Sequence, residues 1–162
     1  MCKLPGNAAR RDGEGARRTL AAMSVRQRTT APVGTARCVI DYALARRSAL
    51  AAYASGRVPR AEICDADTYL LRAARYHGEP TEALCPVCRD TSMVTVTYTF
   101  GDGFRAELNG RARATRELVM MAREYPDFTV YVVEVCPACR WNHLLTSYVL
   151  GTGEPVRRRA RS

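Results

Sequence analysis

Two short cysteine turns constrain this chain more than any other feature of its sequence. Cys85-Pro86-Val87-Cys88 and Cys136-Pro137-Ala138-Cys139 share the pattern Cys-Pro-x-Cys, and 47 residues separate them. Two residues between the cysteines of a tight turn let both sulfurs face one ion, and the proline fixes φ in that turn. Four thiolates at one point are the ligand set of a tetrahedral zinc site. We therefore expect one structural Zn²⁺ per chain, bound by Cys85, Cys88, Cys136 and Cys139.

The same cysteines have two other interpretations, a pair of redox dithiols and a rubredoxin-like iron site. A redox CxxC begins a helix, where the helix dipole lowers the thiol pKa. Here residues 128–135 before Cys136 and residues 141–150 after Cys139 both have the composition of a strand. The second turn is therefore expected at the tip of a β-hairpin, which favours a structural metal over redox chemistry.

The length of 162 residues fits one domain with tails. No apolar run approaches the roughly 20 residues that span a bilayer, and the arginine-rich start lacks the apolar core of a secretory signal. We expect a cytoplasmic protein, in which reduced cysteines bind metal more readily than they form disulfides. The count of seven cysteines is odd. Cys38 and Cys64 fall in apolar segments that resemble helices, so both are expected to be small buried hydrophobic residues.

The net charge of +9 suggests a nucleic-acid partner, but its distribution weakens that reading. Residues 1–35 carry seven basic and two acidic residues, and residues 151–162 carry four Arg and one Glu, so only +1 remains for residues 36–150. We expect disordered basic tails over 1–35 and 152–162 around one domain at 36–151. Such tails bind phosphate backbones without sequence preference, or serve only as soluble ends.

The first part of the domain, residues 36–78, is expected to be helical. Residues 36–55 are rich in Ala, Leu and Arg and contain neither Gly nor Pro, which predicts a helix that ends before Gly56. Pro59 suits the start of a short helix through Ile63. Asp67 is the expected N-cap of a third helix, which ends near His77.

The second part, residues 85–150, is expected to resemble a zinc ribbon. The alternation in Met93–Phe100 predicts a strand with its threonines on one face, and Thr115 is the expected cap of a helix that reaches Tyr125. The strand–turn–strand hairpin around the second cysteine turn follows. The predicted fold is therefore α+β, with a three-stranded antiparallel sheet of the zinc-ribbon type, an inserted helix and an N-terminal helical segment.

Candidate catalytic residues are scarce. The chain has two histidines and no phosphate loop, HExxH or GxSxG pattern, and a zinc with four cysteine ligands has no open position for water. We expect no enzymatic activity. The residues around the second turn are candidates for a binding surface, together with the residue after the first turn. Most of them have an alternative role: Trp141 in the core beside the metal, His143 as a hydrogen-bond donor to a zinc thiolate, and the two arginines in neutralising the negative charge of the thiolates. These candidates are Arg89, Arg140, Trp141, Asn142 and His143.

Several strings resemble one known family. They are Asp41–Leu44, Cys64–Ala66, Tyr69–Ala74, His77–Pro80, Val133–Cys136, Trp141–Leu144 and Ser147–Gly151. Over about residues 38–151 the chain resembles small actinobacterial proteins catalogued as a domain of unknown function with a pair of zinc-binding cysteine turns. The resemblance implies an actinobacterial cytoplasmic protein and supplies no activity.

Three functions follow from these features. The first is a non-enzymatic module in which zinc stabilises a small sheet that binds a protein partner or assembly. The second is a factor associated with nucleic acid, linked to transcription or the ribosome, that uses its basic tails. The third is a redox or metal sensor, in which oxidation of the thiolates releases zinc.

Overall fold

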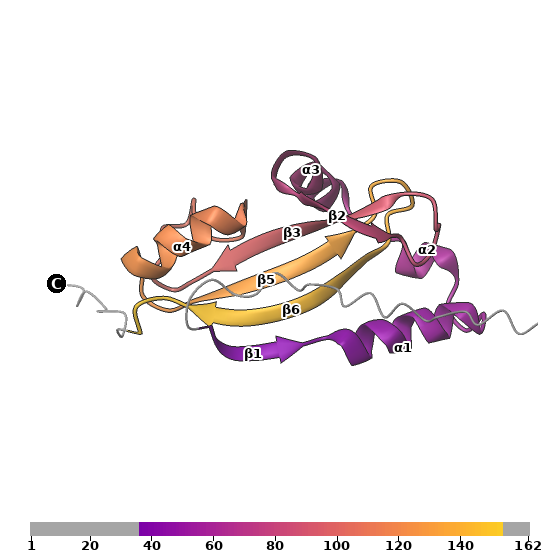
Figure 1. Ribbon diagram of the computed structural model, residues 1–162, viewed down its shortest axis with the longest axis horizontal. Helices are drawn as coiled ribbons and strands as arrows, with labels where there is room; N and C mark the ends of the chain where they lie inside the picture. The colour runs from indigo at the N-terminus through magenta and orange to yellow at the C-terminus, as the bar shows by residue number, and fades with distance from the viewer. Residues whose placement is uncertain (1–35, 154–162) are drawn as a thin grey trace, which may run out of the picture.

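The structure is a computed structural model that describes residues 36–153. In this part of the chain, six strands form one antiparallel sheet in the order β1-β6-β5-β3-β2, with β4 paired to β3 (Figure 1). The elements are β1 (Arg37–Asp41), α1 (Ala43–Ala54), α2 (Arg60–Ile63), α3 (Thr68–His77), β2 (Glu79–Leu84), β3 (Ser92–Phe100), β4 (Arg111–Arg113), α4 (Thr115–Glu124), β5 (Phe128–Val135) and β6 (Asn142–Leu150). The α+β class is confirmed, whereas the expectation of three strands is wrong.

The N-terminal segment does not begin as a helix. Residues 37–41 form β1, which pairs with β6, and α1 starts only at Ala43, whose N–H donates to Asp41 Oδ1 at 2.7 Å. Val39 and Ile40 fit the helical spacing that predicts a helix over 36–55, but these β-branched residues also suit a strand. Cys38 was expected to be buried; it is exposed and has φ +52 at the irregular point of the β1–β6 register.

Two further strands carry weak sequence signals. β2 contains Pro80, which a sheet accepts at an edge position, and β2 is the outermost strand beside β3. β4 has three residues and pairs with the far end of β3. Neither segment has the apolar alternation that marks β3, so tertiary pairing decides their conformation.

The other helices lie close to their predicted positions. Asp67 is the N-cap of α3, and its Oδ1 accepts the Leu70 N–H at 2.6 Å. Thr115 does not cap α4 but is its first residue, after Ala114. The Thr115 N–H donates instead to Glu79 Oε1 of β2 at 2.9 Å, so an acceptor distant in sequence satisfies this helix end.

The two faces of the sheet are covered by different helices. Cross-strand register places Val96 and Val135 on one face and Val130 on the other, because successive residues of a strand alternate sides. α3 packs its Ala73 and Ala74 against the first face. α4 packs on the second face, in a core cluster formed by Phe104, Leu118, Met121, Phe128, Val130, Tyr148 and Leu150.

Hairpin geometry brings the two cysteine turns to the same end of the sheet. The β2–β3 hairpin carries the first turn and the β5–β6 hairpin carries the second, and β3 pairs with β5 between them. Both turns lie beside α2 (Figure 1). No helix within residues 36–153 is long and apolar enough to cross a membrane. The expectations for residues 1–35 and for the end of the chain after residue 153 lie outside the described residues.

Candidate metal centre

The four predicted ligands meet. The Sγ atoms of Cys85, Cys88, Cys136 and Cys139 all lie within 4.8 Å of one another. Two contacts join the two cysteine turns: Cys85 Sγ lies 3.5 Å from Cys139 Sγ, and Cys88 Sγ lies 3.7 Å from Cys136 Sγ. Cys85 and Cys136 are buried, whereas Cys88 and Cys139 are partly exposed.

These distances fit a tetrahedral metal ion. A tetrahedron with metal–sulfur bonds of about 2.3 Å has sulfur–sulfur edges of about 3.8 Å. The observed contacts are close to this value, and they are too long for a disulfide bond of about 2 Å. The four cysteines can therefore hold one metal ion, and their soft thiolate character suits zinc or iron.

Backbone N–H groups in each turn support the sulfurs. The N–H groups of Val87 and Cys88 donate to Cys85 Sγ, and those of Ala138 and Cys139 donate to Cys136 Sγ. Such donors stabilise thiolates and orient them toward a metal. The two turns thus repeat the same local arrangement.

Each turn closes with an arginine in the left-handed region. Arg89 has φ +59 and donates its N–H to the Cys85 carbonyl at 2.9 Å; Arg140 has φ +71 and donates to the Cys136 carbonyl at 3.0 Å. Non-glycine residues rarely adopt this conformation, and the hydrogen bonds of the turn hold both arginines there. Both cysteine turns therefore have the same backbone conformation and hydrogen bonds, although their hairpins lie far apart in the sequence.

The thiols differ in acidity. Burial raises the pKa of Cys85 to about 12 and also raises that of Cys136. Hydrogen bonds from the backbone N–H groups of Asp90 and Thr91 lower the pKa of Cys88 to about 6. Burial acts to raise the pKa of Cys139 as well, but hydrogen bonds from the Trp141 N–H and from neighbouring thiols outweigh it and lower that pKa. The partly exposed thiol of each turn is therefore the more acidic one.

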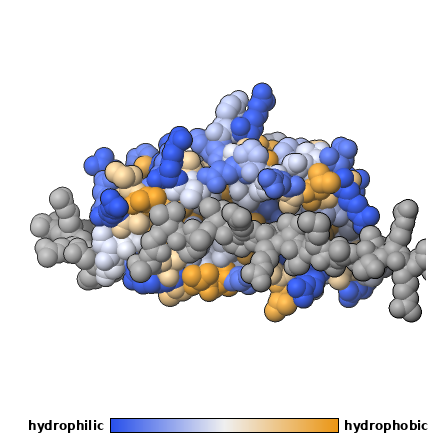
Figure 2. All heavy atoms as spheres, viewed as in Figure 1, coloured by the Kyte–Doolittle hydropathy of each residue, from blue (hydrophilic) through white to orange (hydrophobic). Residues whose placement is uncertain are grey.

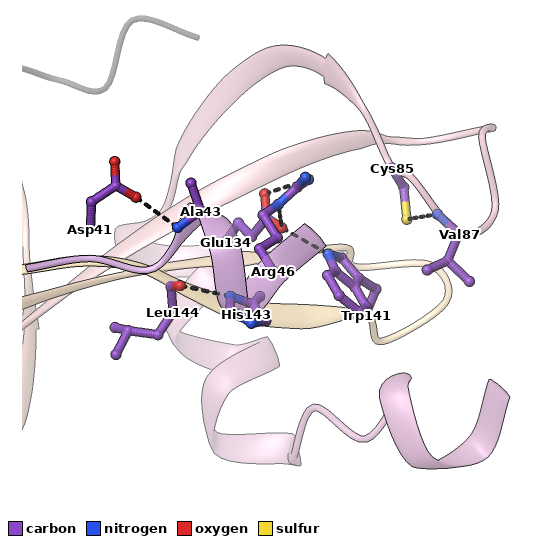
Figure 3. A network of polar contacts seen from close by, with 9 residues as sticks. All are labelled: Asp41, Ala43, Arg46, Cys85, Val87, Glu134, Trp141, His143 and Leu144. Atoms are coloured by element: carbon purple, nitrogen blue, oxygen red, sulfur yellow. Dashed lines mark hydrogen bonds and ion pairs between the residues drawn. The ribbon is translucent and has the colours of Figure 1, made fainter. Parts of the chain in front are cut away.

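A buried polar network adjoins the cluster (Figure 3). The Trp141 indole N–H donates to Glu134 Oε1 at 2.9 Å, and Arg46 of α1 donates to both carboxylate oxygens of Glu134, at 2.5 and 3.2 Å. Trp141 belongs to the same hydrophobic cluster as Cys85, Met93 and Cys136. The network therefore connects α1 to the sheet at the metal centre.

One of the candidate binding residues, Trp141, lies in the interior, and His143 beside it is partly exposed. Trp141 is 1% exposed, so the interpretation of its indole as an exposed anchor for a partner is wrong. Its ring stacks on that of His143 at 5.9 Å between centroids, and His143 Nδ1 lies 2.7 Å from the Leu144 carbonyl oxygen. The buried position of Trp141 agrees with the alternative role in the core that was expected for it.

The polar candidates have different surroundings. Arg140 donates from its guanidinium to the Ala66 carbonyl, and Asn142 donates to Asp65 Oδ1 at 2.8 Å. These contacts attach the α2–α3 connection to the second cysteine turn. Arg89 is exposed at the end of the first turn. Arg89 and Arg140 are thus both exposed, and Arg140 and Asn142 also hold two parts of the fold together.

Two further residues lie beside the four cysteines, and no sequence motif predicted them. Cys64 is the C-cap of α2, and its Sγ lies 3.8 Å from Cys139 Sγ. Interaction with both thiols raises the pKa of Arg60. The spacing from Cys64 to Cys85 matches no short metal motif. Only the tertiary contact of α2 with the second turn brings these residues to the site.

Comparison with known proteins agrees with the resemblance seen in the sequence. The chain belongs to the family described as a family of unknown function (DUF5318), whose profile matches residues 33–162. It is 48% identical over 118 residues to the uncharacterized protein Rv0049 of Mycobacterium tuberculosis and to the uncharacterized protein Mb0050 of Mycobacterium bovis; each match covers 73% of this chain and 85% of the relative. No solved structure matches significantly.

Proposed function

We propose that this member of the family is a non-enzymatic cytoplasmic binding module. One structural Zn²⁺ stabilises its fold, and its surface binds a protein partner. The observation that carries the proposal is the meeting of four thiols at the joined tips of two hairpins. A zinc ion with four cysteine ligands has no position for a substrate or a water molecule. Its contribution is then to stability, because it links two hairpins through a buried centre.

The likeness of these two hairpins to a zinc ribbon supports the same proposal. In this arrangement each of two antiparallel hairpins supplies one cysteine turn, and the metal replaces part of a hydrophobic core. The cluster around Met93 and Trp141 is small, so a metal ion would add substantially to the stability of this end of the sheet. Zinc suits a structural site better than iron does, because zinc is redox-inert.

A candidate surface for the partner lies along β1 and the start of α1. Val39, Ile40 and Leu44 are exposed there, with Leu44 75% exposed. Figure 2 shows apolar atoms along the lower edge of the view, where Figure 1 places these two elements. Among the described residues, β1 is also an edge strand, paired to β6 on one side. An apolar edge strand can accept a strand from another protein.

This surface is testable with charged variants. Val39→Lys with Leu44→Lys should abolish capture of a partner by the metal-loaded full chain, because lysine opposes both burial and strand addition. Met120→Lys, at an equally exposed apolar residue of α4, is the matched control and should leave capture unchanged. Equal loss in both variants, or turnover that a change at His143 abolishes, would contradict the proposal.

A second candidate function, nucleic-acid association, has one specific observation in its favour. The outer side of α3 exposes Tyr69 and Tyr76, 60% and 68% exposed, and Arg72 and Arg75 lie over these rings at 5.9 and 5.7 Å. Tyr69, Arg72, Tyr76 and His77 line a shallow hollow of about 90 Å³. Aromatic rings beside guanidinium groups stack on the bases of single strands.

Salt-dependent binding distinguishes this candidate from the first. Arg72→Ala with Arg75→Ala should weaken binding of a labelled single-stranded RNA, measured by fluorescence anisotropy, by more than Arg105→Ala with Arg123→Ala. The second pair removes the same charge from exposed positions elsewhere. If both pairs weaken binding equally, only overall charge acts, and α3 has no specific role.

A further inference from the structure

A fifth cysteine lies against the cluster of four. Cys64 Sγ is 3.8 Å from Cys139 Sγ, in a contact in which the Cys64 S–H donates to Cys139. That separation is about the sulfur–sulfur edge expected for two ligands of one tetrahedral zinc. The distance between Cys64 Sγ and Cys139 Sγ is therefore that of two thiolates on one zinc ion. Cys64 is nevertheless not one of the four cysteines whose sulfurs all lie close to one another.

The fold fixes Cys64 in this place. The Ala66 N–H donates to the Arg140 carbonyl at 3.0 Å, the Arg140 guanidinium donates back to the Ala66 carbonyl, and Asn142 holds Asp65. All three contacts tie the two residues after Cys64 to the residues just after Cys139. The two thiols are thus kept adjacent by a reciprocal pair of hydrogen bonds between their segments.

The guanidinium of Arg60 interacts with the sulfurs of both Cys64 and Cys139. Arg60 lies one turn before Cys64, and the interaction of its guanidinium with Cys64 and with Cys139 raises the pKa of Arg60. A guanidinium beside both sulfurs favours negative charge on either of them. Both thiols are also partly exposed, whereas Cys85 and Cys136 are buried.

We infer that Cys64 is a spare metal ligand, which can take the place of Cys139 on the zinc ion. This inference rests on the proposed structural zinc. In the exchange, the zinc–sulfur bond to Cys139 breaks, a zinc–sulfur bond to Cys64 forms, and one proton passes from Cys64 to Cys139 along their contact. The number of zinc–sulfur bonds and the net charge stay the same, and no oxidant or reductant takes part. Zinc thus remains bound, while the thiol that is free of the metal changes from Cys64 to Cys139.

Cobalt substitution tests this inference by counting thiolate ligands. Co²⁺ replaces Zn²⁺ in such sites, and its thiolate charge-transfer band grows with the number of bound sulfurs. Cys139→Ser in the full chain should keep the wild-type intensity, because Cys64 completes the four. Cys64→Ser with Cys139→Ser should show three thiolates and bind zinc about 100-fold or more weakly than Cys139→Ser alone.

Cys88→Ser is the matched control, since Cys88 is also the partly exposed cysteine of its turn. It should show three thiolates whether or not Cys64 is present. Equal three-thiolate spectra for Cys139→Ser and for the double variant would overturn the inference. If the wild-type chain itself takes up no cobalt or zinc, the proposed zinc centre fails; four thiolates in the wild type with three in Cys139→Ser rejects only the exchange.

A labelling measurement applies even if Cys139→Ser does not fold. In a Cys2→Ser, Cys38→Ser chain loaded with zinc, limited N-ethylmaleimide should produce singly labelled chains that still hold zinc in native mass spectrometry. Peptide mapping should find the label on Cys64 in some of these chains and on Cys139 in others. A label confined to Cys64 in the zinc-bound chains would contradict the exchange.

Discussion

The indole N–H of Trp141 donates to the carboxylate of Glu134 at 2.9 Å, seven residues back across the hairpin that carries the second cysteine turn. Glu134 is buried and also pairs with Arg46, while Trp141 packs against the thiol cluster. The Glu134 carboxylate therefore accepts the hydrogen bond of a buried indole and also forms the ion pair with an arginine of α1. Loss of that carboxylate would leave both donors without their acceptor, which is costlier than loss of a single exposed contact.

Glu134→Ala is expected to lower the free energy of unfolding by about 2–3 kcal/mol, because it removes the acceptor of Trp141 and the partner of Arg46. Glu134→Gln is the matched control. Its amide oxygen can still accept the indole N–H, so it should cost about half as much. Chemical denaturation followed by the fluorescence of Trp141, the only tryptophan, measures both. Equal costs for the two variants would show that the indole hydrogen bond contributes little.

Gly78 lies between α3 and β2, where neighbouring atoms come too close to leave room for a side chain. A Cβ there would lie 2.2 Å from Val94 Cγ1 and 2.3 Å from the Ala74 carbonyl oxygen. Gly78→Ala should therefore push α3 away from β3 and cost about 2–3 kcal/mol. Gly56→Ala, which has φ +72 but open space around it, should cost only about 1 kcal/mol through backbone strain. Thermal unfolding of the two variants compares them, and the reverse order would contradict the packing described here.

Zinc affinity should fall as the pH falls. Burial raises the pKa of Cys85 to about 12 and raises that of Cys136, so in the metal-free protein both are protonated at pH 7 and must release their protons when zinc binds. Release of at least these two protons gives a rise in affinity of at least about 100-fold from pH 7 to pH 8. Below about pH 6 Cys88 is protonated as well, and the dependence should steepen. Competition with a chelator across this range measures the slope, and a flat profile would exclude thiol ligands.

The sequence predicted the metal centre better than it predicted the sheet. The two Cys-Pro-x-Cys turns are local motifs, so their residues and spacing identify four cysteines that could hold a metal ion without knowledge of the fold. The N-cap role of Asp67 is local in the same way, and it is confirmed. Features determined within one turn of the chain were therefore accessible from the sequence.

Features that depend on distant partners were not accessible. Val39 and Ile40 fit a helical or an extended pattern, and pairing with β6 decides between them. The Thr115 N–H finds its acceptor in Glu79, 36 residues away. Cys64 reaches Cys139 only because α2 docks on the second turn. Each of these contacts joins segments that no short motif relates.

Metal content tests the central claim most directly. Elemental analysis of the full chain purified from the cytosol should find one zinc per chain. Cys136→Ser should lose the zinc and unfold, because Cys136 is a fully buried ligand, whereas Cys38→Ser, at an exposed cysteine away from the cluster, should keep both zinc and fold. Little zinc in the wild-type chain, with titratable free or disulfide-linked thiols at the two turns, would contradict the account.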